Sequence, residues 1–141
     1  MRCITLHQPW ATLAVTGQRQ YELRSWQPDL GWLAIHAAVR ACDDLPAGCI
    51  IGAIKIINII SSYDIGNNDL AIMHGYDNAS DPELSPGMLD DIRQRNKYAW
   101  VIDEAIALPA DMYHYCSGKR KIWHIYDNCD KNLIALSAEM L

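Results

Sequence analysis

Two adjacent stretches decide how this chain folds: LHQPWA at residues 6–11 and GQRQYELRSW at residues 17–26. Proline has a fixed φ and no amide hydrogen, so Pro9 suits the first turn of a helix. The apolar residues that follow recur at helical spacing, and Gly17 supplies a left-handed stop. The sequence therefore predicts a short helix over residues 9–16, directly before a second element.

The second element alternates as a β-strand does over residues 20–24. Glu22 and Arg24 fall on the same face of that strand, two residues apart. One interpretation is an exposed salt bridge, worth under about 1 kcal/mol. The other is a base-recognition pair, since a carboxylate accepts from an exocyclic amine while a guanidinium stacks on a base or binds phosphate. The spacing alone leaves both open.

The order of the motifs resembles the ASCH domain family, a branch of the PUA-like β-barrels. The family's hallmark is a QPWA-type helix start followed by Gly-x-Lys-x-x-Glu-x-Arg-Ser-Trp, and residues 6–26 follow it nearly without gaps. The chain is similar in particular to the ASCH domain of the activating signal cointegrator proteins. Further motifs continue in the family's order at residues 31–37, 48–52, 98–102 and 118–123.

The resemblance implies one domain over residues 1–141, with a mainly β (α+β) fold: a PUA-like, largely antiparallel β-barrel with short flanking helices. Turn residues and apolar runs agree with this. A stretch rich in Ser, Asp, Asn, Gly and Pro at residues 61–87 predicts a long polar connection. The other predicted elements are strands at residues 3–7, 32–37, 49–60, 98–102 and 121–126, short helices at 38–44 and from 86, and a proline-broken extended piece at 105–112.

The charge balance limits the class of ligand. The chain has 12 basic and 17 acidic residues, a net charge of −5, whereas proteins that bind nucleic acid mainly through phosphates carry excess Lys and Arg. Any nucleic-acid site must therefore be local, or the ligand must be small. We expect no membrane span, because no apolar run reaches about 18 residues. Five cysteines without a Cys-x-x-Cys pair favour reduced thiols and a cytoplasmic location.

The resemblance, together with the residue types, implies that the protein binds RNA or single-stranded nucleic acid in a cleft beside the first helix. Trp10 would stack a base, Glu22 would read the edge of that base, and Arg19 and Arg24 would hold phosphate or sugar. For a single aromatic residue the common alternative is a place in the core.

Two further groups are candidates for ligand contacts. His36 lies near the end of a strand that the family motif places beside the cleft. It could donate to a phosphate or to a base edge, and a structural role with internal hydrogen bonds is an equally open alternative. Lys119, Arg120 and Lys121 would extend the phosphate track, although such clusters are often solvated loops. We expect no cofactor and no metal site, because the spacing of His114, Cys116, His124 and Cys129 matches no usual zinc pattern.

Two other functions remain open. The first is a small hydrolase, of amidohydrolase or ribonuclease type, that acts on a modified nucleoside or RNA with Glu22 as the proton-transfer group. Arg19 argues for a binding module over an enzyme, since it stands where the family usually has lysine and a guanidinium is not a useful base. The second is a protein-interaction module in transcription or translation regulation, with the acidic stretch at residues 64–91 facing a protein partner.

Overall fold

The computed structural model describes residues 1–40 and 42–125. Seven strands in this part of the chain form one sheet, and the helices are short. The strands are β1 (Arg2–Leu6), β2 (Tyr21–Arg24), β3 (Gly31–Ala37), β4 (Cys49–Ser61), β5 (Tyr98–Ala107), β6 (His114–Tyr115) and β7 (Ile122–His124). The helices are α1 (Trp10–Val15), α2 (Asn67–Met73) and α3 (Met88–Arg95), with 3-10 turns η1 (Ser62–Asp64) and η2 (Ala110–Met112).

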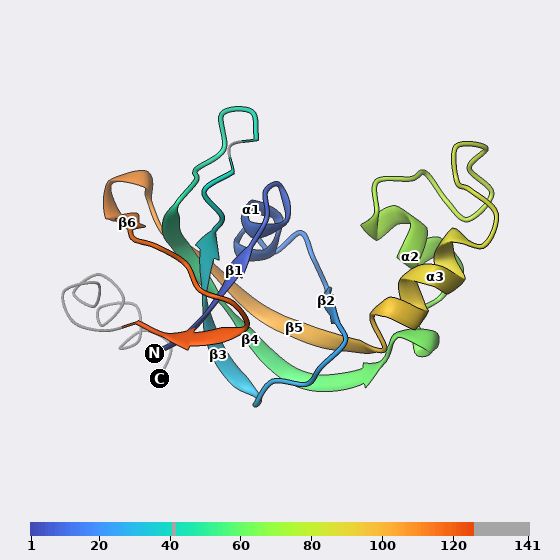
Figure 1. Ribbon diagram of the computed structural model, residues 1–141, viewed down its shortest axis with the longest axis horizontal. Helices are drawn as coiled ribbons and strands as arrows, with labels where there is room; N and C mark the ends of the chain where they lie inside the picture. Colours follow the sequence, from blue (N-terminus) through green and yellow to red (C-terminus); the bar gives the residue numbers. More distant parts are fainter. Residues whose placement is uncertain (41, 126–141) are drawn as a thin grey trace.

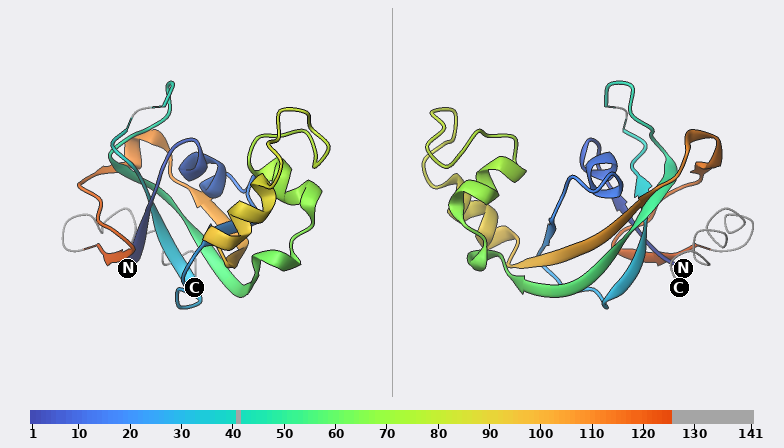
Figure 2. Two further views of the ribbon diagram at one scale, coloured as in Figure 1. Left: turned by 45° about the vertical axis from the view of Figure 1, so that its right-hand side comes forward. Right: turned by 180° about the vertical axis from the view of Figure 1, so that it is seen from behind.

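The sheet is curled into a half-barrel, with α1 on its concave side and α2 and α3 at one end (Figures 1 and 2). Its strand order is β2-β5-β4-β3-β1-β7, and β6 pairs with β4 outside this path. The β1–β3 pair is parallel and the other pairs are antiparallel. The prediction of a mainly β, largely antiparallel fold with short flanking helices is therefore confirmed.

The main core lies between the concave face of the sheet and α1. Isoleucines of β4 and β3 are fully buried there beside Trp100, and Ala14 and Val15 bring α1 onto them. Gly52 of β4 makes this approach possible, because a Cβ at that position would collide with the carbonyl of Ile106 and with Val15. The helix that bears Trp10 is thus held in the mouth of the half-barrel.

A second apolar cluster attaches the helical end of the molecule to the sheet. Leu23 of β2 and Ala99 of β5 pack there against Leu70 of α2. Arg93 of α3 is buried and donates to the backbone carbonyls of Ser62 and Ile65 and to the side chain of Asn67. The side chain of Arg93 therefore ties α3 to η1 and to the start of α2.

The structure differs from the sequence prediction in three elements. The connection at residues 61–87 contains α2, in which Leu70 and Ala71 are buried and Leu70 packs against the sheet. The helix predicted at residues 38–44 is wrong: residues 38–40 and 42–44 form a turn-rich link from β3 to β4, closed by a hydrogen bond from Gly48 N to Ala37 O. The extended piece predicted at 105–112 begins as an unbroken continuation of β5, because β4 is long enough to pair with it.

The predicted strand at 121–126 is observed as β7, and its last predicted residue, Tyr126, lies outside the described residues, as does Cys129. Among residues 1–40 and 42–125, no helix is long and apolar enough to cross a membrane.

Candidate nucleic-acid interface

Residues of the QPWA motif set the position of α1. The side chain of Gln8 is buried; its Oε1 accepts from the backbone N of Thr12, and its Nε2 donates to the carbonyl of Pro46. Gln8 therefore supports the first turn of the helix and ties it to the β3–β4 link. At the other end Gly17 has a φ of 78°, and bonds from Gly17 N and Gln18 N back into the helix close a Schellman motif. The chain then turns directly into β2.

Glu22 lies at the centre of an ion-pair cluster that this turn assembles. Its Oε2 accepts from Nη1 of Arg19 at 3.0 Å, and its Oε1 accepts from Nε of Arg24 at 3.2 Å. The side chains of Glu22 and Arg19 are 8% and 11% exposed, whereas that of Arg24 is 31% exposed. Both oxygens of the carboxylate therefore have a charged partner, and Arg24 is the member of the cluster most open to solvent.

The guanidinium of Arg19 also lies over the ring of Trp10, with its carbon 4.9 Å from the ring centroid. This cation–π contact joins α1 to the turn that leads into β2. Burial lowers the pKa of Arg19, Glu22 opposes that shift, and the charge of Arg24 adds to it. The Nε of Arg19 is buried without a hydrogen-bond partner. Arg19 therefore orients Glu22 and covers Trp10, and only part of its hydrogen-bonding capacity is used.

A cleft opens beside this cluster, between α1 and the start of β2 on one wall and α2 on the other. Its larger part has a volume of about 510 Å³ and a smaller part about 160 Å³, and both are lined by Trp10 and Arg19. The size of the larger part is typical of small-ligand sites. Glu22 lines the smaller part together with His74. The predicted residues Trp10, Arg19 and Glu22 therefore do meet at one cleft.

Sequence reasoning missed the second wall of the cleft. Asp69, Ile72 and Met73 of α2 line its larger part, and Met73 and His74 line the smaller one. Nδ1 of His74 is 2.9 Å from the carbonyl oxygen of Leu70, one turn earlier. The signal in the sequence was weak: the apolar residues at 70–73 sit inside a stretch rich in turn-forming residues, which predicted a connection and not a helix.

His36 lies in the interior of the fold and is 1% exposed. Its Nε2 is 2.7 Å from the carbonyl oxygen of Cys116, and its Nδ1 is 3.2 Å from Oγ1 of Thr5, which in turn accepts from Nε1 of Trp123. Burial lowers the pKa of His36, while its bond to Cys116 raises it to a smaller extent. This geometry favours the structural role of His36 over contact with a ligand.

Lys119, Arg120 and Lys121 are exposed, and they precede β7. The sheet order puts β7 at the opposite end of the strand path from β2, which carries Glu22 and Arg24. The basic cluster and the ion-pair cluster are therefore not joined by neighbouring strands. The structure groups Trp10, Arg19, Glu22 and Arg24 and leaves the basic cluster apart from them.

Within residues 1–40 and 42–125, no group of three or more His, Cys, Asp or Glu side chains is close enough together to hold a metal ion. The polar and aromatic groups that line the cleft include the indole of Trp10, the guanidinium of Arg19, the carboxylates of Glu22 and Asp69, and the imidazole of His74. Together they suit hydrogen bonding and stacking with a planar polar ligand.

Comparisons with known proteins agree with this architecture. The sequence profile of the ASCH domain matches residues 4–109. Activating signal cointegrator 1 from Homo sapiens is 31% identical over 83 aligned residues, which cover 42% of this chain and 14% of that protein. The protein of the same name from Mus musculus matches with the same identity and coverage. The chain thus spans only a small part of the length of these relatives.

Among solved structures, the crystal structure of ASCH from Zymomonas mobilis is similar over 96% of this chain and 94% of its own, with a TM-score of 0.59 and 16% sequence identity. Two structures of variants of that protein match with a TM-score of 0.54 each, also at 16% identity. At this identity the likeness shows the fold alone, which is the PUA-like fold that the sequence predicted.

Proposed function

The chain belongs to the ASCH domain family, and from this membership and the geometry of its cleft we propose that it binds RNA or single-stranded nucleic acid. One observation carries the proposal: a buried carboxylate, Glu22, is held between two arginines in the wall of a cleft that also presents Trp10. This arrangement combines an acceptor for base edges, an aromatic surface and positive charge within one small area.

Each group has a defined part in the proposal. A carboxylate oxygen accepts more than one hydrogen bond, so Glu22 can accept from the exocyclic amine of a base while its arginine contacts persist. Trp10 supplies a ring for stacking. Arg24 is the more exposed arginine of the cluster and takes a phosphate or sugar, whereas Arg19 is mostly buried and fixes the carboxylate.

The overall charge shapes the expected binding behaviour. The proposed site has one partly exposed arginine, Arg24, in a chain with a net charge of −5, so we expect few phosphate contacts and an affinity that falls only slightly as salt increases. Base stacking and base-edge hydrogen bonds then carry a larger share of the affinity than in a basic nucleic-acid-binding protein. A local site of this kind agrees with the separate position of the basic cluster before β7.

The test is a titration with short single-stranded RNAs that differ only in base, at about 0.15 M salt, followed by fluorescence anisotropy. We expect saturable binding with a preference for bases that carry an exocyclic amine. Glu22→Gln should reduce that preference, and Arg24→Ala should weaken all sequences similarly. Arg40→Ala removes a more exposed arginine that lies outside the cluster, and it serves as the control for the loss of one positive charge.

Equal loss of affinity for every base in Glu22→Gln would refute base reading by that carboxylate. Absence of binding to any RNA would refute the proposal itself. Each variant is compared at a temperature at which its circular dichroism matches that of the parent protein, so that loss of folding is not mistaken for loss of binding.

A second function has one specific observation in its favour, namely that Glu22 and His74 line the same 160 Å³ cavity. A carboxylate and an imidazole in one site are the usual groups for general acid–base catalysis. This hydrolase hypothesis predicts turnover of an acylated nucleoside that Glu22→Gln and His74→Ala both abolish. Unchanged substrate after prolonged incubation with the folded protein would remove it.

A further inference from the structure

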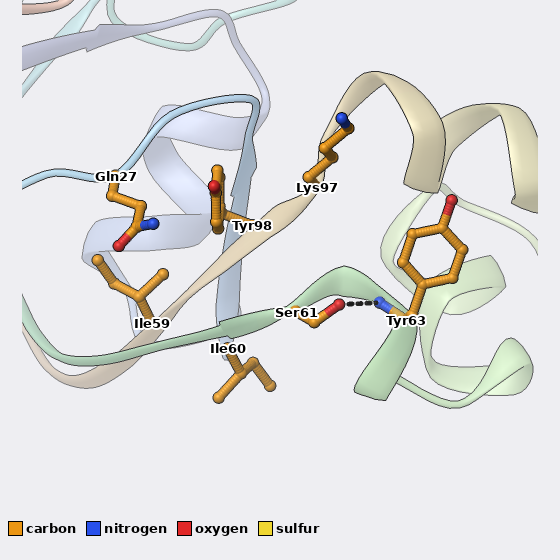
Figure 3. A pocket seen from close by; sticks show the side chains of 7 residues that line it. All are labelled: Gln27, Ile59, Ile60, Ser61, Tyr63, Lys97 and Tyr98. Atoms are coloured by element: carbon orange, nitrogen blue, oxygen red, sulfur yellow. Dashed lines mark hydrogen bonds between the residues drawn. The ribbon is translucent and has the colours of Figure 1, made fainter.

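A second cavity lies next to the cleft and is lined by Tyr63, Lys97 and Tyr98, together with Gln27, Ile59, Ile60 and Ser61. Its volume is about 340 Å³, within the range of ligand sites. Figure 3 shows Lys97 between Tyr98 and Tyr63 in this view, while Ile60 points away from the other side chains. Tyr63 is 57% exposed, and Lys97 is also exposed.

The two sites are connected through a short piece of backbone. Asn96 lines the smaller part of the cleft beside Glu22, and the next two residues, Lys97 and Tyr98, line the second cavity. Tyr98 is also the direct partner of Arg24 in the pairing of β2 with β5. Because directly opposed residues of a strand pair project to the same face of the sheet, Arg24 and Tyr98 are neighbours between the two sites.

The charges around the second cavity suit an anion. None of the seven residues that line it is acidic, although the chain as a whole has five more acidic than basic residues. Asp64, which follows Tyr63 in η1, is the nearest carboxylate along the chain, and it is not among the lining residues. Lys97 therefore provides a positive charge, and Arg24 provides a second one on the path from the cleft.

Aromatic rings next to a cationic side chain are the groups that bind successive nucleotides of a single strand. From this placement we infer that the second cavity is a further nucleotide subsite, so that the ligand is an oligonucleotide that spans both sites. One base is held at Trp10 and Glu22, a second stacks at Tyr63 and Tyr98, and Arg24 and Lys97 contact the phosphates between them. This inference rests on the proposed function, and it specifies that the ligand is an oligonucleotide and not a single nucleoside.

The experiment measures affinity by isothermal titration calorimetry for adenylate ligands of one, two, four and six nucleotides. We expect the affinity to rise with length until both sites are filled. Tyr63→Ala should weaken the six-nucleotide ligand by about fivefold or more and leave the mononucleotide unchanged, because stacking at the second cavity is available only to the longer ligand. Lys97→Gln should reduce, by about one, the steepness with which the logarithm of the affinity for the longer ligand falls with the logarithm of the salt concentration.

Tyr115→Ala is the matched control, because Tyr115 is a comparably exposed tyrosine on β6, away from both sites. If the six-nucleotide ligand binds no more tightly than the mononucleotide, or if Tyr63→Ala and Lys97→Gln leave it unchanged, the second subsite is refuted while RNA binding at the cleft stands. If no ligand of any length binds, the proposed function itself fails. The two failures are therefore distinguishable in one data set.

Discussion

Glu22→Gln is the substitution that tests most directly how the cleft is held together. It keeps the size of the side chain and removes its negative charge. The Arg19–Glu22 contact is about nine-tenths buried on both sides, and loss of one partner from a buried pair costs about 3–5 kcal/mol. The contact with Arg24 is nearly one-third exposed, so it adds under about 1 kcal/mol.

The amide oxygen of glutamine keeps one acceptor, so part of this loss is recovered and we expect a decrease in the free energy of unfolding of about 2–4 kcal/mol. For a chain of this length that decrease corresponds to a fall in Tm of roughly 5–15 °C. Urea unfolding followed by tryptophan fluorescence measures it, with an unchanged m-value as the sign that the unfolded state is not altered.

The control is Glu104→Gln, which removes an exposed carboxylate from β5 and should change the free energy of unfolding by less than about 0.5 kcal/mol. A double-mutant cycle with Arg19→Met isolates the pair, and we expect a coupling energy of about 1–3 kcal/mol. If Glu22→Gln is as stable as Glu104→Gln, or if the effects in the cycle are additive, the Arg19–Glu22 pair does not stabilise the fold.

Three further predictions concern the supports of the site. Gly118→Ala should cost about 1–3 kcal/mol, because a Cβ there would collide with Thr5 and His36; an unchanged Tm would refute this packing. Burial lowers the pKa of His36, so the unfolded chain takes up the proton first, and stability should decrease as the pH falls below about 6.5, by at most about 1.4 kcal/mol per pH unit. Urea unfolding at pH 7.5 and pH 5 measures this, and His36→Gln should give a flatter profile than the parent. Arg93→Met should lower the protection of α2 amides in hydrogen exchange before it affects the central strands, since Arg93 ties α3 to η1 and α2; equal protection in both proteins would argue against that role.

Local patterns in the sequence were sufficient for the elements that depend on near neighbours. Pro9 and Gly17 delimit α1 within a residue or two, because helix ends are set by φ preferences and backbone hydrogen bonds of adjacent residues. Alternation predicted β2, and the isoleucine-rich run predicted β4. The motif order also placed the chain in its family, and Trp10, Arg19 and Glu22 do line one cleft.

Long-range packing decided what local patterns did not contain. The apolar residues of α2 form a helix within a polar stretch because Leu70 docks against β2 and β5, and that docking supplies the second wall of the cleft. The strand order places β7, which follows the basic cluster, at the other end of the strand path from β2. Sequence periodicity does not encode which strands become neighbours.

The sequence by itself therefore determined the family, the mainly β class and the helix–strand unit that carries the candidate site. Only the tertiary structure decided that Arg19 covers Trp10 and binds Glu22, that His36 is an interior hydrogen-bonding group, and that Tyr63, Lys97 and Tyr98 share a cavity. The physical reason is that helix and strand signals arise from residues a few positions apart, whereas these contacts join side chains whose proximity follows from the curvature and pairing of the whole sheet.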